Sequence, residues 1–297
     1  MPTFLSKPVC IVNPIAGRGR RARALVEKAL RAAGIDPILH ETRAKGHGFE
    51  LALQALETGA TCVIAAGGDG TLNEVAGALV DNRVPLGVIP MGSGNAFARA
   101  WKISLNPSNA CHQLVSSAIL AMDVGVVEGH LFLSTAGLGL DAEVARRYAA
   151  RTGKRRGLIP YVTQTLSALV ACEPCPVRLI VDDKATSDCR PLLLVVANTA
   201  NYGSGAVIAP GADPCDGLLS VRVFEPRNLW SLAINARRLF TRSIDRMPGV
   251  SGFEARSLRV ERPEPGYLQC DGEAQLGPAH LQFGVKPGAL YVLVPSS

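Results

Sequence analysis

Short apolar runs alternate with amphipathic stretches over the first third of the chain. Runs with the length and composition of buried strands lie at residues 9–12, 37–40, 61–65 and 85–89. Helical patterns lie between them, at residues 20–33, 49–56 and 72–80, and Gly34 and Gly59 end the first two. Strands that alternate with helices in this way predict a parallel sheet covered on both faces.

After about residue 122 the pattern changes to short β-rich runs separated by turns. These runs lie at residues 124–127, 131–135, 177–181, 192–196, 218–224, 257–261, 267–270 and 290–294. Helical stretches near 142–170 and 229–242 interrupt them. Such a series predicts an antiparallel sandwich or barrel. We therefore expect an α/β domain over residues 1–124 and a β-rich, sandwich-like domain over 125–297, and leave open whether the extreme C-terminus returns to the first domain.

Composition narrows the class of protein. Of the 297 residues, 47% are hydrophobic and 19% charged, which excludes extensive disorder. The net charge of +6 suits nucleotides, anionic lipid surfaces or nucleic acid without distinguishing them. We predict no transmembrane helix and no signal peptide. The eight cysteines lack disulfide spacing, so we expect a reduced, cytoplasmic protein.

The most informative turn follows the third predicted strand. Gly67, Gly68 and Gly70 surround Asp69, and a helical pattern opens at Leu72. A strand, a glycine turn and a helix together direct N–H groups and the positive end of a helix dipole at an anion. We expect the glycines to allow close approach and positive φ. A carboxylate beside phosphate implies Mg²⁺ or a hydroxyl nucleophile, so the turn indicates phosphoryl transfer.

Two further glycine segments follow the first and the fourth predicted strands. They are Asn13–Gly19 and Pro90–Arg99. Each alone could equally be a tight turn, but three on one sheet edge favour a polyphosphate cradle. The first segment also satisfies the dinucleotide pattern G-x-G-x-x-A, which would leave the other two unexplained.

Together these motifs resemble the diacylglycerol kinase catalytic domain, found in bacterial YegS-like and diacylglycerol-kinase-like lipid kinases and in sphingosine and ceramide kinases. The resemblance covers nearly the whole chain and is carried by Asn13–Gly17, Gly67–Asn73, Pro90–Arg99 and Asp271–Glu273. NAD kinases share the glycine–aspartate signature. The resemblance implies ATP- and Mg²⁺-dependent phosphate transfer to a lipid hydroxyl, with the active site in the cleft between an NAD-kinase-like α/β domain and a β-sandwich-like domain.

The resemblance also implies which residues act. Those that bind the nucleotide would be Asn13, Thr42, Gly67, Gly68, Asp69, Gly70, Thr71, Leu72, Asn73 and Ser93. Asp69, Asp271 and Glu273 are the catalytic candidates. Alternation along an extended segment would place Asp271 and Glu273 on one face, where one is the base and the other helps to position metal. Which of them is the base stays open. The alternative for this segment is a plain solvated turn without a catalytic role.

A second acidic segment resembles a structural Mg²⁺ site of the bacterial lipid kinases. Its ligands would be the side chains of Asp213 and Asp216 and the carbonyl of Leu218, with a capped turn as the alternative. Ala96 departs from the bacterial pattern, which often has Asp there. Asp123 and Asp141 remain as nearby carboxylates, and Asp141 could face the acceptor head group or cap a helix.

A basic run near the middle of the chain suggests a membrane partner. It comprises Arg146, Arg147, Arg151, Lys154, Arg155 and Arg156. We expect peripheral attachment to an anionic membrane surface, with a solvated helical face as the alternative. The run contains a single aromatic residue, Tyr148, and not the interleaved series that stacks on bases, so we expect no nucleic acid. A homodimer, an NAD-kinase-like phosphotransferase and a catalytically lapsed nucleotide-binding regulatory protein stay open, as does the choice among diacylglycerol-like, phosphatidylglycerol-like and sphingoid acceptors.

Overall fold

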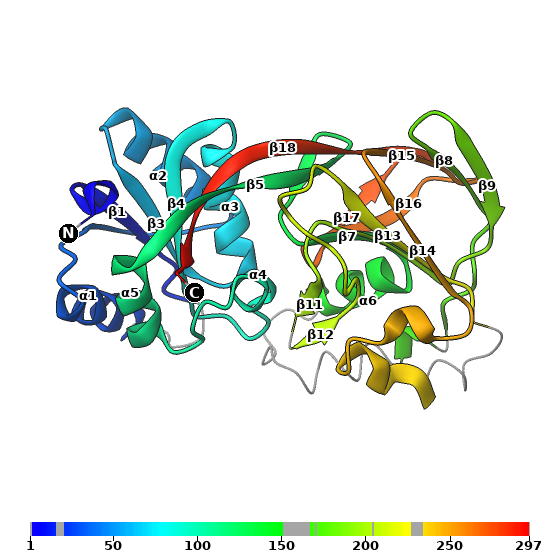
Figure 1. The fold of residues 1–297 in the computed structure, drawn as a ribbon, viewed down its shortest axis with the longest axis horizontal. Coiled ribbons are helices and arrows are strands. Elements are labelled where there is room, and N and C mark those ends of the chain that lie inside the picture. Colours follow the sequence, from blue (N-terminus) through cyan, green and yellow to red (C-terminus); the bar gives the residue numbers. More distant parts are fainter. Residues whose placement is uncertain are drawn as a thin grey trace. The chain divides into compact units, whose positions relative to one another are not determined.

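The structure is a computed structural model that describes residues 2–15, 21–150, 167–169, 171–203, 205–226 and 234–296. The chain divides into two compact units (Figure 1). Unit 1 comprises residues 1–122 and 288–297, and unit 2 comprises residues 123–287. The structural boundary thus falls between Met122 and Asp123, and the last ten residues belong with the first unit.

Unit 1 is built on a parallel sheet with the strand order β2-β1-β3-β4-β18. The strands are β1 (Pro8–Val12), β2 (Ile38–Glu41), β3 (Cys62–Gly67), β4 (Asn82–Pro90) and the last part of β18 (His280–Pro295). The helices are η1 (Thr3–Leu5), α1 (Ala22–Ala32), α2 (His47–Glu57), α3 (Asp69–Leu79), α4 (Ala96–Ala100) and α5 (Pro107–Val115). α1 packs with α5 and α2 packs with α3, one pair on each face of the sheet (Figure 1). The predicted parallel sheet with two covered faces is confirmed.

The apolar runs of this unit form strands because both of their faces are buried. Every residue of β1 and of β3 is buried, as expected for a parallel strand with helices on either side. α1 ends where Gly34 adopts a φ of 81°, and α2 ends before Gly59 at 73°. These glycines are the predicted helix ends.

Unit 2 is a sandwich of two antiparallel sheets. One has the order β14-β13-β10-β7-β16-β17, and the other contains β18-β15-β8-β9 with the β5–β6 hairpin. The strands are β5 (Ser117–Val127), β6 (His130–Phe132), β7 (Thr135–Gly139), β8 (Val177–Val181), β9 (Ala185–Cys189), β10 (Leu193–Ala197), β11 (Asn201–Gly203), β12 (Ala206–Val207), β13 (Leu219–Phe224), β14 (Val250–Ala255), β15 (Ser257–Glu261), β16 (Gly266–Cys270) and β17 (Glu273–Gly277). Both sheets contribute to one core, for example Phe132 and Phe283 from one and Leu194 and Val221 from the other. The predicted sandwich is confirmed.

Short helices decorate this sandwich. They are α6 (Leu140–Ala149), η3 (Ala236–Leu239) and η4 (Ile244–Arg246). The helical predictions over 142–170 and 229–242 therefore coincide with described helix only in part, because 151–166, 170 and 227–233 lie outside the described residues. In the part of the chain that the structure describes, no helix is long and apolar enough to cross a membrane.

Two local predictions were wrong. Residues 131–135 do not form one strand, because β6 ends at Phe132 and the N–H groups of Leu133 and Ser134 turn to the carboxylate of Asp271. Residues 271–273 are not extended either. Asp271 and Gly272, at φ of 47° and 84°, form the turn that joins β16 to β17, so strand alternation cannot place Asp271 and Glu273 on one face.

Candidate active site

The predicted nucleotide loops of unit 1 leave the same edge of the parallel sheet. Asn13 follows β1, Thr42 follows β2, and Gly67 ends β3. Beyond the strands the backbone ladder continues, since the Asn13 N–H donates to the Ala66 carbonyl and the Met91 N–H donates to the Gly67 carbonyl, at 2.9 and 2.7 Å. The structure therefore brings the loops that follow β1, β3 and β4 together at the carboxyl ends of the strands, where open α/β sheets bind ligands.

Close contacts within and between these loops leave no room for a Cβ at Gly67 or Gly92. A Cβ on Gly92 would lie 2.7 Å from the Cα of Gly68, and a Cβ on Gly67 would lie 2.6 Å from the side chain of Thr71. These close approaches are between parts of the protein itself, and the predicted close approach to an anion stays a prediction. The predicted positive φ was wrong: Gly67, Gly68 and Gly70 all lie outside that region.

Asp69 is the first residue of α3 and joins the two central loops. Its half-buried carboxylate accepts hydrogen bonds from the backbone N–H groups of Phe97, Ala96 and Asn95, at the start of α4. Burial raises the pKa of Asp69, and these N–H groups oppose that rise because they stabilise the charged form. Residue 96 contributes through its backbone, so the alanine found there keeps this contact.

Other predicted nucleotide residues hold the loops in place. Asn13 donates from Nδ2 to the Thr71 hydroxyl at 2.8 Å. Leu72 is buried and its N–H donates to the Gly68 carbonyl, so it supports the turn from inside. Ser93, by contrast, is exposed at the tip of its loop.

Glu74 supports the candidate site, and sequence reasoning assigned it no role. Its carboxylate accepts the N–H groups of Gly46 and Gly48 at 2.8 and 3.0 Å and so ties α3 to the start of α2. A Cβ on Gly48 would lie 2.7 Å from the Glu74 Oε2. The only signal in the sequence was its place at the end of the glycine–aspartate stretch.

In unit 2, Asp271 is held by consecutive backbone groups. Its carboxylate accepts the N–H groups of Leu133, Ser134 and Thr135 at 2.6, 2.8 and 2.9 Å, and its own N–H donates to the Thr135 carbonyl at 2.8 Å. Glu273, at the start of β17, is exposed. The two predicted carboxylates therefore differ in burial, because Asp271 is half-buried against three backbone donors and Glu273 is exposed.

Asp141 is a buried carboxylate next to this hairpin. Gln269 donates from Nε2 to its Oδ2 at 2.6 Å, and the Tyr202 hydroxyl donates to its Oδ1. Gln269 also accepts the N–H of Gly272 at 2.7 Å, which links Asp141 to the Asp271 turn. Burial raises the pKa of Asp141 to about 7, and the Gln269 hydrogen bond opposes that rise. The N-cap alternative was wrong, since Gly139 is the N-cap of α6.

The predicted Mg²⁺ ligands lie on one acidic loop. Asp213 and Asp216 each accept a backbone N–H two residues ahead, from Cys215 and Leu218, at 3.1 and 2.9 Å. Burial and the charges of Asp213, Asp123 and Asp216 raise the pKa of the Cys215 thiol to about 11. Within the described ranges, no group of three or more His, Cys, Asp or Glu gathers in a form that would hold a metal. The set of two carboxylates and a carbonyl stays a prediction.

Asp123 is the centre of a polar cluster beside that loop. It is 2% exposed, and its Oδ2 accepts the N–H of Gly217 at 2.7 Å. Asn198 donates to the carbonyls of Asp123 and Leu133 at 2.8 and 3.0 Å. Three buried side-chain atoms of the described residues lack a hydrogen-bond partner: Trp101 Nε1 in unit 1, and Asn198 Oδ1 and Thr199 Oγ1 in unit 2. Oxygen atoms beside a buried carboxylate are the type of ligand that a hard cation such as Mg²⁺ takes.

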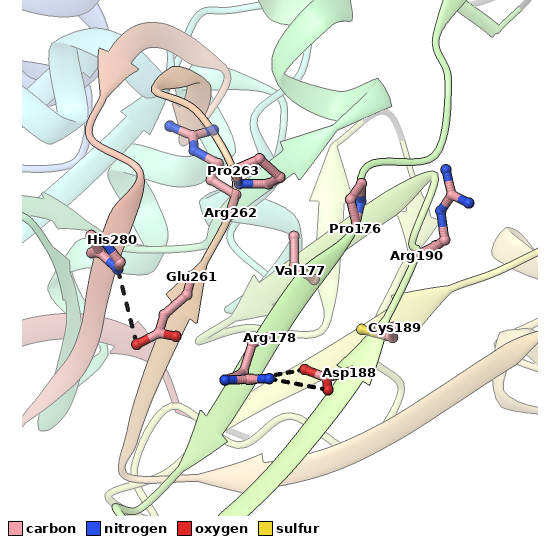
Figure 2. A pocket seen from close by; sticks show the side chains of 10 residues that line it. All are labelled: Pro176, Val177, Arg178, Asp188, Cys189, Arg190, Glu261, Arg262, Pro263 and His280. Atoms are coloured by element: carbon pink, nitrogen blue, oxygen red, sulfur yellow. Dashed lines mark hydrogen bonds and ion pairs between the residues drawn. The ribbon is translucent and has the colours of Figure 1, made fainter.

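Figure 2 shows a surface hollow of about 520 Å³ elsewhere in unit 2. Its charged lining is partly paired, with Arg178 bound to Asp188 at 2.9 Å and His280 lying 3.9 Å from Glu261. No predicted site residue lines it. The hollow is therefore separate from the candidate site.

Comparison with protein families decides the assignment. The family model described as "Diacylglycerol kinase catalytic domain" matches residues 7–127, and the model described as "YegS C-terminal NAD kinase beta sandwich-like domain" matches residues 134–294. The chain belongs to the diacylglycerol kinase catalytic domain family. The predicted family and enzyme class are confirmed, and both matched regions correspond to the predicted fold class.

Individual members of this family resemble the chain over nearly its full length. A Pseudomonas fluorescens protein named "Probable lipid kinase YegS-like" is 31% identical, with 97% of this chain and 95% of that protein covered. A Mycobacterium tuberculosis "Diacylglycerol kinase" is 28% identical, with 98% and 96% covered. A solved diacylglycerol kinase structure from Bacillus anthracis has a TM-score of 0.73 at 21% identity, with 97% and 96% covered, and shows the same fold.

In this member of the diacylglycerol kinase family, the predicted nucleotide and catalytic residues lie in two groups, apart from the acidic loop of Asp213 and Asp216. The nucleotide group lies at one sheet edge of unit 1, and the Asp271 hairpin lies in unit 2 with Asp141 beside it. The part of the basic run from Arg151 to Arg156 lies outside the described residues. Arg146 and Arg147 are described, and both pair with Glu143, at 2.7 and 2.5 Å.

Proposed function

We propose that this protein is an ATP- and Mg²⁺-dependent lipid kinase that transfers the γ-phosphate of ATP to the hydroxyl group of a lipid. The observation that carries the proposal is the contact between the Gly67–Thr71 turn and the Met91–Asn95 loop. This contact fixes Asp69 beyond the carboxyl ends of β3 and β4. A kinase needs its phosphate-binding loops and one carboxylate set in advance, because positioning and charge stabilisation supply most of the catalysis.

In this proposal the triphosphate is bound by backbone groups of unit 1. The first turn of α3 has N–H groups without intrahelical partners, and its dipole favours negative charge. Asn13 and Thr71 are bonded to each other and so hold the β1 loop against this turn. The exposed Ser93 supplies a hydroxyl from the neighbouring loop.

We further propose that the acidic loop of unit 2 holds a structural Mg²⁺ through Asp213, Asp216 and the Leu218 carbonyl. The charges around Cys215 and the orphaned oxygen of Asn198 support this. At the transferring phosphate, Asp69 would assist a second Mg²⁺, which when bound neutralises charge on the phosphate oxygens.

For the acceptor, we propose that Glu273 is the general base. The Asp271 carboxylate already accepts three backbone N–H groups, so a proton arriving there would displace one of them. Glu273 is exposed, and the turn fixed by Asp271 precedes it directly. We therefore assign Asp271 to positioning and Glu273 to proton removal.

The lipid acceptor suggests where the enzyme works. We propose a cytoplasmic protein that attaches peripherally to an anionic membrane surface. The acceptor in this proposal is a diacylglycerol-like, a phosphatidylglycerol-like or a sphingoid lipid.

The test is phosphate transfer from labelled ATP, with and without Mg²⁺, to separate samples of these lipids and of NAD. Label in one lipid class, dependent on Mg²⁺, is the expected result. Label only in NAD would replace the proposal with an NAD-kinase-like activity. Nucleotide binding without transfer to any acceptor would indicate a regulatory protein instead.

A further inference from the structure

One segment of unit 2 exposes large apolar side chains among arginines. We call residues 234–246, which include η3 and η4 and precede β14 (Figure 1), the arginine segment. Ile234 is 69% exposed and Phe240 is 64% exposed. Arg237, Arg242 and Arg246 are exposed beside them.

The exposure of these apolar side chains does not come from a loose attachment of the segment. Leu239, Ile244 and Met247 pack into a core cluster with residues of β10 and β13, including Val195 and Phe224. The backbone also folds back on itself, since the Phe240 N–H donates to the Arg237 carbonyl at 3.0 Å. The fold thus fixes the inner side chains and leaves Ile234 and Phe240 outside.

The charge of the segment is one-sided. Its one acidic residue, Asp245, accepts a hydrogen bond from Arg222 Nε at 2.7 Å, and Arg222 also lies 3.7 Å from Glu254, so one acidic residue stands against four arginines in the segment. Among the described residues, no ion pair involves Arg237, Arg242 or Arg246. The segment therefore presents uncompensated positive charge around two apolar side chains.

We propose that the arginine segment is a docking surface for an anionic lipid bilayer. Aromatic and aliphatic side chains enter the boundary between head groups and acyl chains, and arginines stay at the phosphates. Charge complementarity commits the surface to anionic lipid, because cations near such a leaflet are attracted to it. The inference rests on the proposed function only in that a lipid kinase meets its acceptor at a bilayer.

The segment is also connected to the candidate site. Tyr202 packs against the same core cluster that holds Leu239, Ile244 and Met247, and its hydroxyl donates to Asp141. The arginine segment and the Asp141 carboxylate are thus both in contact with one cluster of packed side chains.

The experiment measures binding of the full chain, without ATP, to vesicles of phosphatidylcholine with and without phosphatidylglycerol. Arg237→Gln, Arg242→Gln and Arg246→Gln together should lower the partition coefficient on anionic vesicles about 100-fold at low salt, at about fivefold per cation. Ile234→Ser with Phe240→Ser should lower it about tenfold or more, also at high salt, where the arginine effect is screened. Thermal unfolding of both variants checks that the segment is still packed onto the core of unit 2.

Matched controls use exposed residues elsewhere in unit 2. Lys184→Gln, Arg190→Gln and Arg256→Gln remove the same net charge, and Leu276→Ser removes a side chain that is 71% exposed. Binding by these controls should equal that of the unaltered chain. If the segment variants bind anionic vesicles as well as the controls do, the inference is overturned. Because the assay contains no ATP, its result is independent of whether any lipid is phosphorylated.

Discussion

The glycine loops of unit 1 and the Asp271 hairpin of unit 2 hold a carboxylate in the same manner. Asp69 accepts the N–H groups of residues 95–97, and Asp271 accepts those of residues 133–135. In both cases consecutive backbone N–H groups surround the acid, so its position does not depend on flexible side chains. Charged acceptors form the stronger class of hydrogen bond, which makes this a rigid arrangement.

The two regions differ in how the chain brings donor and acceptor together. The loops around Asp69 follow β3 and β4, neighbouring strands of a parallel sheet that are also consecutive in sequence. The donors of Asp271 are 136–138 residues away along the chain. Beside Asp271 stands Asp141, which is bound by side chains and buried. The comparison teaches that backbone donors fix the position of a carboxylate. Burial among side chains instead raises the pKa of a carboxyl group, as at Asp141, and favours its protonated form.

The largest expected effect tests the unit 1 side of this comparison. Asp69→Asn should lower the turnover number about 10²–10³-fold, because it removes the carboxylate charge that the phosphate-binding loops hold in place. The new amide would face backbone N–H groups, so a stability loss of about 1 kcal/mol should accompany it. Steady-state kinetics and thermal unfolding measure both.

The control for this change is Asp36→Asn, whose side chain is 89% exposed. It should leave turnover and stability unaltered. Near-normal turnover of Asp69→Asn would show that the glycine turn is structural only.

The next effect concerns Asp141 and is a dependence on pH. Its folded pKa of about 7 lies above the ordinary value of 3.8, so the folded state holds a proton that the unfolded state releases. The stabilising contribution is therefore complete below pH 4 and is lost as the pH rises to 7. The Asp141→Asn side chain stays neutral at every pH. Between pH 4 and 8 the free energy of unfolding of this variant should therefore fall by at least about 2 kcal/mol less than that of the unaltered protein.

Urea unfolding of both proteins at several pH values measures that difference. If the two stability curves ran parallel from pH 4 to 8, Asp141 would be charged throughout and the contrast with Asp271 would disappear.

A third change separates positioning from proton removal in unit 2. Asp271→Asn keeps an oxygen for two of the N–H groups but turns an amide toward the third, so the free energy of unfolding should fall by about 2 kcal/mol. The backbone itself should tolerate the change, since Asn accepts the φ of 47°. Glu273→Gln, at an exposed position, should change stability by less than about 0.5 kcal/mol and still reduce turnover.

Denaturant unfolding and kinetics on both variants test the assignment of roles. Equal stability of the two variants would show that the three N–H contacts contribute nothing, and a fully active Glu273→Gln would exclude it as the base.

The smallest expected effect tests the contact between the unit 1 loops. Gly92→Ala would place a methyl group 2.7 Å from the Cα of Gly68, so the loops must shift at a cost of about 1–2 kcal/mol. Nucleotide affinity should fall with stability. Gly284→Ala is the control, because a Cβ there meets nothing within 4 Å. Equal nucleotide affinity of the two variants would remove the link between loop packing and binding.

Much of the fold could be predicted because its signals are local. Buried runs such as residues 9–12 and turns such as Gly34 report on neighbours within a few residues, which secondary structure depends on. The strand end, the glycine turn and the helix around Asp69 were likewise predictable, since adjacent elements of a parallel sheet bring their loops to one edge. The β7, β9, β11, β14 and β17 strands mix polar residues or glycine with apolar ones, and β12 is only two residues long, so these strands lack a clear local signal and were missed.

What only the tertiary structure decided is the environment of each acid. The sequence by itself determined that Asp69, Asp141, Asp271 and Glu273 exist beside turns and strands, and to which family their motifs belong. It could not determine that Leu133 and Ser134 leave their strand to bind Asp271, or that Gln269 and Tyr202 close around Asp141. Hydrogen bonds and burial depend on which distant segments the folded chain packs together. The same packing turned Ile234 and Phe240 outward while it buried Leu239, Ile244 and Met247, because a core takes up only the side chains that its backbone directs inward.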